Sequence, residues 1–312
     1  MSDDERGPTR RDALRCMGWA GTGALWAMQG GIASSTLLGS ANATPAPSAS
    51  FTFLQVSDSH IGFAKAANPD ARVTYREAVA KIIAMPAKPD FILHTGDVSQ
   101  LSRDSEFDDA DQILREAGVT AFHVPGEHDM LDEGNGKAFL ERYGRTTEAL
   151  GDGWYSFDYK GVHFVGLVNV KDLRPGGAGK LGADQIAWLG KDLARHPAST
   201  PIVLFAHIPL WTLYGPWGWG TDDAAAALAL LARFGSVTIL NGHVHQIAQK
   251  VEGAMTFHTA RSTAFPQPMP GTAEAPGPQV VPPGALRGLL GITDVTVQAN
   301  RARIALTDSL LA

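Results

Sequence analysis

The chain has 312 residues, of which 44% are hydrophobic and 19% are charged, and its formal net charge at pH 7 is −6. This composition is that of a globular protein with enough apolar residues for a large core. The acidic balance lacks the basic signature expected of a nucleic-acid-binding protein, and it argues against attachment to anionic membranes by charge alone.

The first 43 residues are typical of an export signal. Arg10 and Arg11 precede a Gly- and Ala-rich apolar stretch, Met17–Leu38, and Ser40–Ala43 offers the small residues that a signal peptidase accepts. Paired arginines before a weakly apolar run resemble a twin-arginine signal, which exports folded proteins. A membrane anchor is the alternative, and the glycines in the run disfavour it. We therefore predict export by the twin-arginine machinery to the periplasm or medium, with no stable membrane anchor after cleavage.

The remainder of the chain is predicted to be one domain without disulfides. The only cysteine, Cys16, lies inside the signal segment, so the mature chain would contain neither disulfides nor thiolate ligands. Residues 44–50 are rich in Pro, Ala and Ser and are predicted to form a linker. Residues 51–312 are predicted to form a single domain, because no linker-like break interrupts the motifs that follow.

The front half of this domain alternates apolar runs with helical patterns. Strands are expected at Phe51–Ser57, Phe91–His94 and Val119–Val124, and helices at Asp70–Met85 and Asp104–Ala117. A βαβαβ order predicts parallel strands with helices packed on the sheet.

The rear half is predicted to contain more short strands. Trp154–Tyr159 and Val162–Val168 favour a hairpin around Lys160 and Gly161. Further helices are expected at Ala183–Arg195 and Asp222–Phe234, and strands at Pro201–Ala206, Ser236–Leu240, Ile247–Val251, Met255–Thr259, Thr293–Gln298 and Ala302–Thr307. This half is expected to be antiparallel, and the Pro- and Gly-rich segment Phe265–Gly284 is expected to be an irregular loop.

Five short blocks place polar side chains directly after apolar runs. They are Asp58-Ser59-His60, Gly96-Asp97, Gly126-Glu127-His128-Asp129, His207 and Gly242-His243-Val244-His245. Residues i and i+2 of an extended chain share a face, so the Asp-x-His and His-x-His pairs each point two ligands the same way. Such ligands suit Zn, Mn, Fe or Co. A single Asp-Ser-His or Gly-Asp is more often a turn or cap, but five blocks together predict a metal site.

The order of the blocks resembles the D-x-H, G-D, G-N-H-[DE], H, G-H-x-H pattern of calcineurin-like metallophosphoesterases over about residues 51–260. The resemblance implies an α/β fold, an αββα sandwich of two mixed β-sheets flanked by helices. It assigns one metal to Asp58, His60 and His245, a second to Glu127, His207 and His243, and a bridging role to Asp97. His128 would protonate the leaving group, and Asp129 would orient His128.

The implied reaction is hydrolysis of a small phosphoester at two metal ions about 3.5–4 Å apart. The ions lower the pKa of a shared water, and the resulting bridging hydroxide attacks phosphorus while the leaving oxygen is protonated. Two divalent ions of Mn, Fe, Zn or Co are expected. A non-catalytic metal- or phosphoester-binding protein is the alternative from another class, and the presence of His128 and Asp129 argues against it.

Glu127 departs from the asparagine of the family pattern. A third carboxylate lowers the summed charge of two divalent ions, the carboxylates and one hydroxide from plus one to zero. A neutral centre attracts a dianionic monoester less, which predicts a phosphodiesterase rather than a phosphomonoesterase or protein-phosphatase-like enzyme. One Fe(III) ion would restore the charge, and a Glu127 turned away would leave the second position weak. We predict that Glu127 is a ligand.

Substrate contacts are predicted from the aromatic run after His207 and from Arg261. Trp211 and Trp217 stand in that run, which also contains Tyr214 and Trp219, and could form a pocket wall or pack on the body of the protein. Arg261 could reach a phosphoryl oxygen or form a surface ion pair. Five other histidines match no ligand position and are predicted to be packed or on the surface, with a supporting role as the alternative for the first two: His94, His123, His163, His196 and His258.

Overall fold

The structure is a computed structural model that describes residues 23–29, 32–38, 47, 49–144, 153–171, 173, 177–299 and 304–312. The chain divides into two compact units, Met1–Ala43 and Thr44–Ala312. In the first unit, strands β1 (Gly23–Gln29) and β2 (Ile32–Leu38) pair in antiparallel fashion. The paired arginines and the cleavage motif lie outside the described residues, so the export signal stays a prediction.

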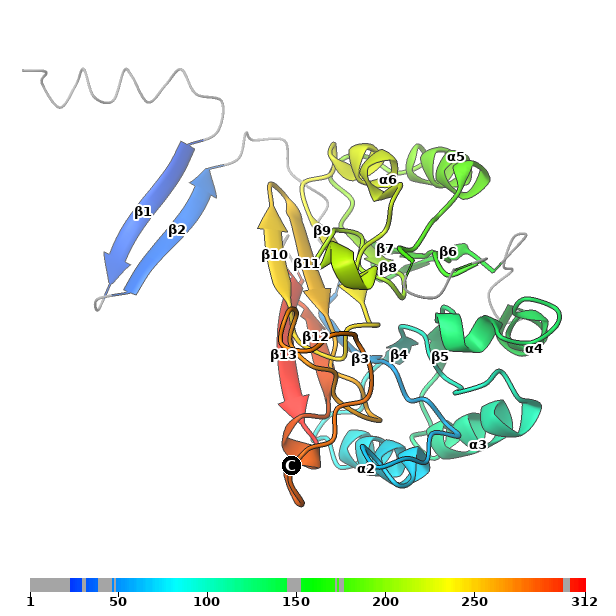
Figure 1. The fold of residues 1–312 in the computed structure, drawn as a ribbon. Helices are drawn as coiled ribbons and strands as arrows, with labels where there is room; N and C mark the ends of the chain where they lie inside the picture. Colours follow the sequence, from blue (N-terminus) through cyan, green and yellow to red (C-terminus); the bar gives the residue numbers. More distant parts are fainter. Residues whose placement is uncertain are drawn as a thin grey trace, which may run out of the picture. The chain divides into compact units, whose positions relative to one another are not determined.

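Two β-sheets stack face to face in the second unit, with helices on their outer sides (Figure 1). The five-stranded sheet has the order β13–β12–β3–β4–β5, from Ile304–Leu310, Gly291–Val297, Phe51–Val56, Phe91–His94 and Ala121–His123. The six-stranded sheet has the order β10–β11–β9–β8–β7–β6, from Gln249–Glu252, Met255–Thr259, Val237–Asn241, Ile202–Phe205, Val162–Gly166 and Tyr155–Tyr159. The predicted αββα sandwich is therefore confirmed.

Strand β3 shows why the apolar runs are continuous rather than alternating. Phe51 and Phe53 point between the two sheets, whereas Leu54 and Val56 belong to the core beneath the helices on the outer side. Between the sheets, the Phe53 ring meets the Phe164 ring edge-on, with centroids 5.4 Å apart. A strand buried on both faces needs apolar residues at successive positions, which produces the pattern recognised in the sequence.

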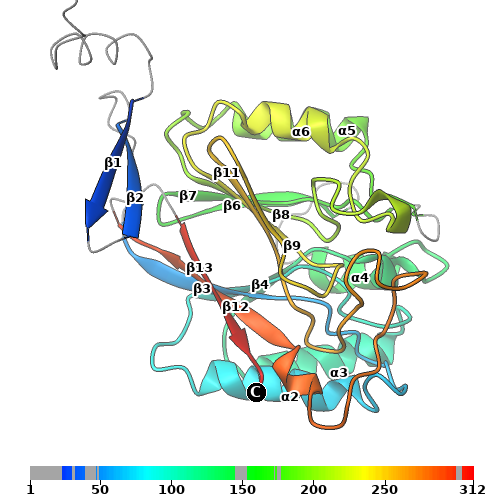
Figure 2. The same cartoon turned by 60° about the vertical axis from the view of Figure 1, so that its left-hand side comes forward.

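Helices α2 (Ala71–Ile83), α3 (Asp104–Arg115) and α4 (Lys137–Tyr143) pack on the five-stranded sheet, and α5 (Ala183–Leu193) and α6 (Ala224–Leu231) pack on the six-stranded sheet (Figure 2). Asp70 caps α2 by accepting a hydrogen bond from the Arg72 backbone N–H. The predicted helices are present with slightly shorter bounds. Helix α4 was not predicted, because seven residues are too few to show a helical period.

Strand directions agree with the prediction in the front half and differ in the rear half. Strands β3, β4 and β5 are parallel, and β6 and β7 form the predicted antiparallel hairpin. The expectation of an antiparallel rear is wrong for β7, β8, β9 and β11, which run parallel to one another. Helices α5 and α6 cause this for β7, β8 and β9, since each returns the chain to the end at which the previous strand began. For β11 the antiparallel strand β10 makes the return.

The irregular segment predicted at Phe265–Gly284 contains neither helix nor strand. None of the helices in the described part of the chain combines the length and the apolar character that a membrane span requires. The parallel order in both sheets has one consequence for the site. The loops that follow β3, β4, β5, β8 and β9 all leave from carboxyl ends of strands, which is where ligands gather in sheets of this kind.

Candidate metal centre

The loops after these five strands carry the seven predicted metal ligands. Asp58 and His60 follow β3, Asp97 follows β4, Glu127 follows β5, His207 follows β8, and His243 and His245 follow β9. Glu127 and His243 are partly buried and the other five are buried. Ligand atoms of these residues fall into overlapping groups, in each of which all atoms lie within 4.8 Å of one another. Side chains separated by up to about 190 positions in sequence are thus brought together.

The first group consists of Asp58, His60 and His245. His245 Nε2 lies 3.2 Å from Asp58 Oδ1 and 3.2 Å from His60 Nε2. His245 Nδ1 lies 2.6 Å from the carbonyl oxygen of Phe265, so Nδ1 donates a proton there. This hydrogen bond at Nδ1 leaves Nε2 directed at the centre, which is the orientation that a metal ligand needs.

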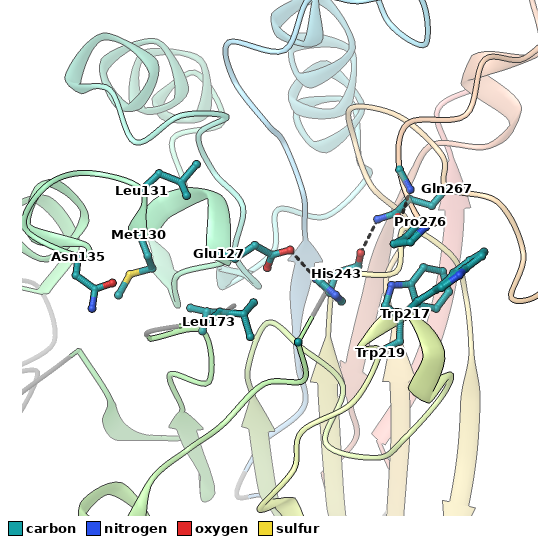
Figure 3. Close-up of a pocket in the computed structure, with 13 residues that line it drawn as sticks. Glu127, Met130, Leu131, Asn135, Leu173, Trp217, Trp219, His243, Gln267 and Pro276 are labelled. Atoms are coloured by element: carbon teal, nitrogen blue, oxygen red, sulfur yellow. Dashed lines mark hydrogen bonds and ion pairs between the residues drawn. The ribbon is translucent and has the colours of Figure 1, made fainter. Parts of the chain in front are cut away.

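The second group consists of Glu127, His207 and His243. Glu127 Oε2 lies 2.9 Å from His207 Nε2, and Glu127 Oε1 lies 2.9 Å from His243 Nδ1. Figure 3 shows Glu127 and His243 pointing toward each other. His207 Nδ1 donates to the carbonyl oxygen of Thr95 at 2.7 Å, which turns Nε2 toward the centre. The structure thus places Glu127 beside the two histidines with which it is predicted to share an ion.

Asp97 lies between the two groups. Its Oδ2 is 3.4 Å from His60 Nε2 in the first group and 3.4 Å from His207 Nε2 in the second. Its Oδ1 accepts a hydrogen bond of 2.9 Å from the backbone N–H of His128, which holds the carboxylate in this orientation. The position is the one that a bridging ligand requires.

Several donor atoms of the centre have no hydrogen-bond partner within the protein, and transition-metal ions are suitable partners for them. Asp58 Oδ2, Glu127 Oε2, His207 Nε2 and His243 Nδ1 are all buried without a hydrogen-bond partner. Glu127 Oε2 and His207 Nε2 are only 2.9 Å apart, yet they lack hydrogen-bond geometry. Buried polar atoms without partners are costly, and a shared cation removes that cost. Imidazole nitrogens with carboxylate oxygens suit Zn, Mn, Fe or Co.

The backbone is strained at most of these ligands. Five of the seven have positive φ, namely Asp58 at 54°, His60 at 41°, Asp97 at 52°, His243 at 70° and His245 at 55°. A left-handed conformation of a residue other than glycine costs about 1–3 kcal/mol and persists only where the surroundings impose it. The strained turns aim each side chain at the centre, and metal binding gives that arrangement a function.

Glycines precede the ligands because neighbouring loops approach closely. A Cβ at Gly126 would lie 2.0 Å from Asp97 Oδ1, and a Cβ at Gly242 would lie 2.1 Å from Ser57 Oγ. Neither position has room for a side chain. The Gly-Glu and Gly-His steps of the motifs are therefore packing requirements of the centre itself.

The close packing of carboxylates and imidazoles shifts the pKa values of several candidate ligands. Burial raises the pKa of the Asp58 and Glu127 carboxyls, but the neighbouring histidines outweigh it and hold each pKa below its usual value. Burial lowers the pKa of His60 to about 3. Burial also lowers the pKa of His207, but Asp97 and Glu127 outweigh it and raise this pKa well above its usual value. Metal binding at His207 must therefore displace a proton.

The predicted proton donor, His128, lies beside the first group. Its ring meets the His60 ring edge-on, with centroids 4.8 Å apart. His128 Nδ1 donates to the carbonyl oxygen of Gln100 at 2.7 Å. Nε2 is consequently the ring nitrogen that is available to carry a proton to a substrate.

Asp129 does not make the predicted orienting contact with the His128 ring. Its carboxylate accepts hydrogen bonds from the backbone N–H groups of Val98, Ser99 and Gly126 at 3.0, 2.8 and 3.0 Å. Both residues lie in the short turn η1 (Glu127–Met130), in which consecutive side chains point in different directions. The side chains of His128 and Asp129 are therefore not hydrogen-bonded to each other although the two residues are adjacent in sequence. Asp129 ties this turn to the loop after β4, and Gln100 holds His128.

A cavity of about 350 Å³ adjoins the second group, and Glu127 and His243 line it (Figure 3). Trp217 lies in its wall, where the sequence predicted a substrate contact, and Trp219 lies beside it. Trp211 instead packs on Phe257 of the six-stranded sheet, with ring centroids 5.2 Å apart. Trp211 does not line this cavity and packs on the body of the protein, which was the alternative left open by the sequence.

Arg261 is also directed away from the centre. Its Nη1 donates to the carbonyl oxygen of Leu289 at 3.2 Å. Arg261 is not among the described residues that line the cavity beside the second group, and its contact with a phosphoryl oxygen stays a prediction. Arg261 follows β11, and its guanidinium extends toward the segment that leads into β12, which sequence separation alone does not reveal.

Phe265 is a residue of the centre that the sequence did not indicate. Its ring centroid lies 4.7 Å from those of both His60 and His245, and its carbonyl oxygen orients His245. A backbone carbonyl has no sequence signature. His94 and His123 are buried, as predicted, and His94 Nε2 contacts Ser59 Oγ at 3.0 Å, which supports the loop between Asp58 and His60.

Curated relatives resemble the chain over more than half of its length. A probable cyclic nucleotide phosphodiesterase of Synechococcus sp. is 28% identical over 185 residues, which are 58% of this chain and 68% of that protein. A glycerophosphodiester phosphodiesterase of Enterobacter lignolyticus is 25% identical over 226 residues, which are 70% of this chain and 78% of that protein.

Solved structures share the fold at lower identity. A dimetal phosphatase from Danio rerio matches with a TM-score of 0.60 and 14% identity, over 84% of this chain and 96% of that one. A purple acid phosphatase from yellow lupin matches with a TM-score of 0.57 and 15% identity, over 85% of this chain and 52% of that one. Residues 51–247 match the family model described as calcineurin-like phosphoesterase. The chain therefore belongs to the calcineurin-like phosphoesterase family, as its motifs predicted.

Proposed function

We propose that this metal-dependent phosphoester hydrolase uses two metal ions and prefers phosphodiesters to phosphomonoesters. The observation that carries the proposal is the position of Glu127, whose two carboxylate oxygens lie 2.9 Å from His207 and 2.9 Å from His243. A carboxylate there reduces the positive charge that a dianionic monoester would meet, while a singly charged diester loses less attraction. The names of two similar proteins, both phosphodiesterases, agree with this choice.

The ligand sets divide between two ions. Asp58, His60 and His245 would hold one ion, Glu127, His207 and His243 the other, and Asp97 would contact both. Two divalent ions of Mn, Fe, Zn or Co suit these donors, and one Fe(III) is the alternative for a centre with three carboxylates. When bound, the pair would lower the pKa of a water molecule and offset the negative charge of the phosphoryl group.

His128 would supply the proton that the leaving oxygen needs. Water releases one proton to solvent and its oxygen forms a bond to phosphorus, while the bond from phosphorus to the leaving oxygen breaks. The leaving oxygen takes the proton from His128 Nε2, and His128 recovers a proton from solvent. Gln100 keeps the opposite ring nitrogen engaged at 2.7 Å, so the ring faces the substrate with one defined nitrogen. Asp97 positions the same residue through its backbone N–H.

Replacing His128 by alanine should harm poor leaving groups most. We expect kcat/KM to fall about 100-fold or more for diesters that release an alkyl alcohol, since general acid catalysis contributes about 100- to 10,000-fold. A nitrophenolate departs without a proton, so bis(4-nitrophenyl) phosphate should lose much less. Steady-state kinetics on both substrates tests this, with His196→Ala as a control at a partly buried histidine in the turn after α5. Equal losses on both substrates would show that His128 is not the acid.

Replacing Glu127 by asparagine should shift the enzyme toward monoesters. We expect the ratio of kcat/KM for 4-nitrophenyl phosphate to that for bis(4-nitrophenyl) phosphate to rise about tenfold or more, because one negative charge within about 4 Å is removed. Metal content is measured on the same samples. Glu133→Asn is the matched control, since it makes the same change at an exposed position of the same loop. An unchanged ratio with two ions still bound would contradict the charge argument.

The same measurement tests the proposed function in the wild-type enzyme. A higher kcat/KM for the diester supports the proposal, and a higher value for the monoester would identify a phosphomonoesterase instead. Export is a separate proposal that rests on the sequence of residues 1–43. We propose cleavage after Ala43 and release into the periplasm or medium, and N-terminal sequencing of the secreted protein checks the position.

A further inference from the structure

The described residues that line the cavity beside the metal centre do not include the predicted proton donor, His128. Glu127 and His243 of the second ligand group line the cavity, whereas His128 does not and instead contacts His60 of the first group. The leaving oxygen must reach His128 to be protonated. A phosphodiester carries two alcohol groups, of which one leaves and the other stays bonded to phosphorus. A group that occupies the cavity is therefore the one that stays, which we call the retained arm.

The cavity has two apolar walls that face each other across Glu127 and His243 (Figure 3). One wall holds Trp217, Trp219 and Pro276 with the polar Gln267 at its edge, and the other holds Met130, Leu131 and Leu173 with the polar Asn135 at its edge (Figure 3). Its volume of about 350 Å³ is near the lower end of the range for small-molecule pockets, about 300–1,000 Å³. It has room for one ring or a short branched chain.

The aromatic wall is rigid before a substrate binds. The Trp217 ring meets the Tyr214 ring edge-on at 5.1 Å and the Trp219 ring edge-on at 5.0 Å. Gln267 donates to the His243 carbonyl oxygen at 2.8 Å and accepts from the Gly277 N–H at 3.1 Å, which ties the irregular loop to the site. A wall that is already ordered binds a ring at a lower entropic cost.

The charge of the lining selects against a charged arm. Among the described residues that line the cavity, the ionisable side chains are those of Glu127 and His243, and neither a lysine nor an arginine is present. A carboxylate or phosphate on the arm would lose its hydration without gaining a cationic partner. An uncharged apolar arm would gain from contact with both walls.

We propose that this cavity binds the retained arm of a phosphodiester and selects an uncharged, apolar alcohol of about the size of one ring, with Trp217 as the specificity-determining residue. The inference rests on the proposed phosphodiesterase function. Water adds to phosphorus, the bond to the other arm breaks, and its oxygen takes the proton. The product in the cavity is the monoester of the apolar alcohol, with its phosphorus–oxygen bond intact.

The test compares substrates that share a leaving group and differ in the retained arm. We expect the metal-loaded wild-type enzyme to hydrolyse benzyl 4-nitrophenyl phosphate with a kcat/KM about tenfold or more above that of methyl 4-nitrophenyl phosphate, as burial of a ring predicts. Trp217→Ala should lower the benzyl value about tenfold and leave the methyl value nearly unchanged. Trp211→Ala is the matched control from the same loop and should leave the ratio unchanged, since Trp211 packs elsewhere.

A second substrate tests the orientation directly. Benzyl methyl phosphate carries two alcohols of similar leaving ability, so the cavity decides which one departs. We expect methanol and benzyl phosphate as the products, identified by phosphorus NMR. Release of benzyl alcohol with methyl phosphate would overturn the orientation.

A third measurement does not depend on the folding of a tryptophan variant. Leu131 is 56% exposed at the cavity, so Leu131→Lys is tolerated there and adds a cation. It should raise kcat/KM for a 4-carboxybenzyl arm relative to a benzyl arm. If the ratios of kcat/KM between substrates with different retained arms stay unchanged in both Trp217→Ala and Leu131→Lys, the cavity does not bind the retained arm. The proposed diesterase activity would be unaffected by that result. Hydrolysis of monoesters alone would instead overturn the proposed function and this inference together.

Discussion

Replacing Asp97 by asparagine should lower kcat/KM for a phosphodiester about 1,000-fold, which is the scale of losing one principal charge-stabilising group in an active site. Asp97 Oδ2 lies 3.4 Å from a predicted ligand of each ion, so a neutral amide weakens both positions at once. The substitution preserves the local fold, because asparagine tolerates the φ of 52° and its amide oxygen still accepts the His128 N–H. The loss therefore reports on the metals rather than on misfolding.

Elemental analysis and kinetics on the same preparation check this result. The variant should retain fewer ions per chain than the wild type after loading with Mn or Zn and gel filtration. Asp109→Asn provides the control, since Asp109 is exposed and pairs with Arg72 far from the centre. A variant that keeps two ions and more than about a tenth of the activity would remove Asp97 from the bridging position.

Removing the metals should lower the melting temperature of the protein by about 8–16 °C. A single ion at about 1,000 times its dissociation constant stabilises the native state by about 4 kcal/mol, so the expected shift counts only the tighter of the two proposed ions. Each kcal/mol shifts the melting temperature of a domain of this size by about 2–4 °C. The structural cause is the set of unpaired buried donor atoms, combined with five ligands held at positive φ.

Calorimetry of the protein after dialysis against a chelator, and again after return of Mn or Zn, measures this shift. The wild-type protein should recover its melting temperature on reloading. Asp97→Asn should respond to the chelator less than the wild type, because it holds less metal to lose. A melting temperature that is the same in the loaded and chelated samples would show that the centre binds no ion tightly.

A helix or strand can be predicted from the sequence where its burial produces a recognisable pattern of apolar residues. Strand β3 was recognised because both of its faces are buried, and Phe53 and Leu54 belong to cores on opposite sides of the sheet. The direction of β8 and β9 was mispredicted, since direction is set by the helices that return the chain and not by the apolar run itself. Helix α4 was not predicted because its seven residues make fewer than two helical turns, which is too short for a periodic pattern.

The predictability of the site depends on whether a residue acts through its side chain. Asp58, His60 and Asp97 were recognised because a polar side chain after a buried strand has few structural explanations. Gln100 and Phe265 act through carbonyl oxygens that hold His128 and His245, and every residue type carries a carbonyl. Such contacts leave no trace in the choice of amino acid.

The sequence alone determined the family and the αββα architecture, and it identified the seven candidate ligands that the fold brings together, because strand ends and metal donors are encoded in local patterns of residue type. The tertiary structure decided which neighbours hold those residues and which aromatic rings reach the cavity. Asp129 binds backbone N–H groups, Trp211 packs on the sheet and Arg261 turns to Leu289, although all three were expected at the site. Side-chain direction in turns and loops follows from long-range packing, which no local pattern specifies.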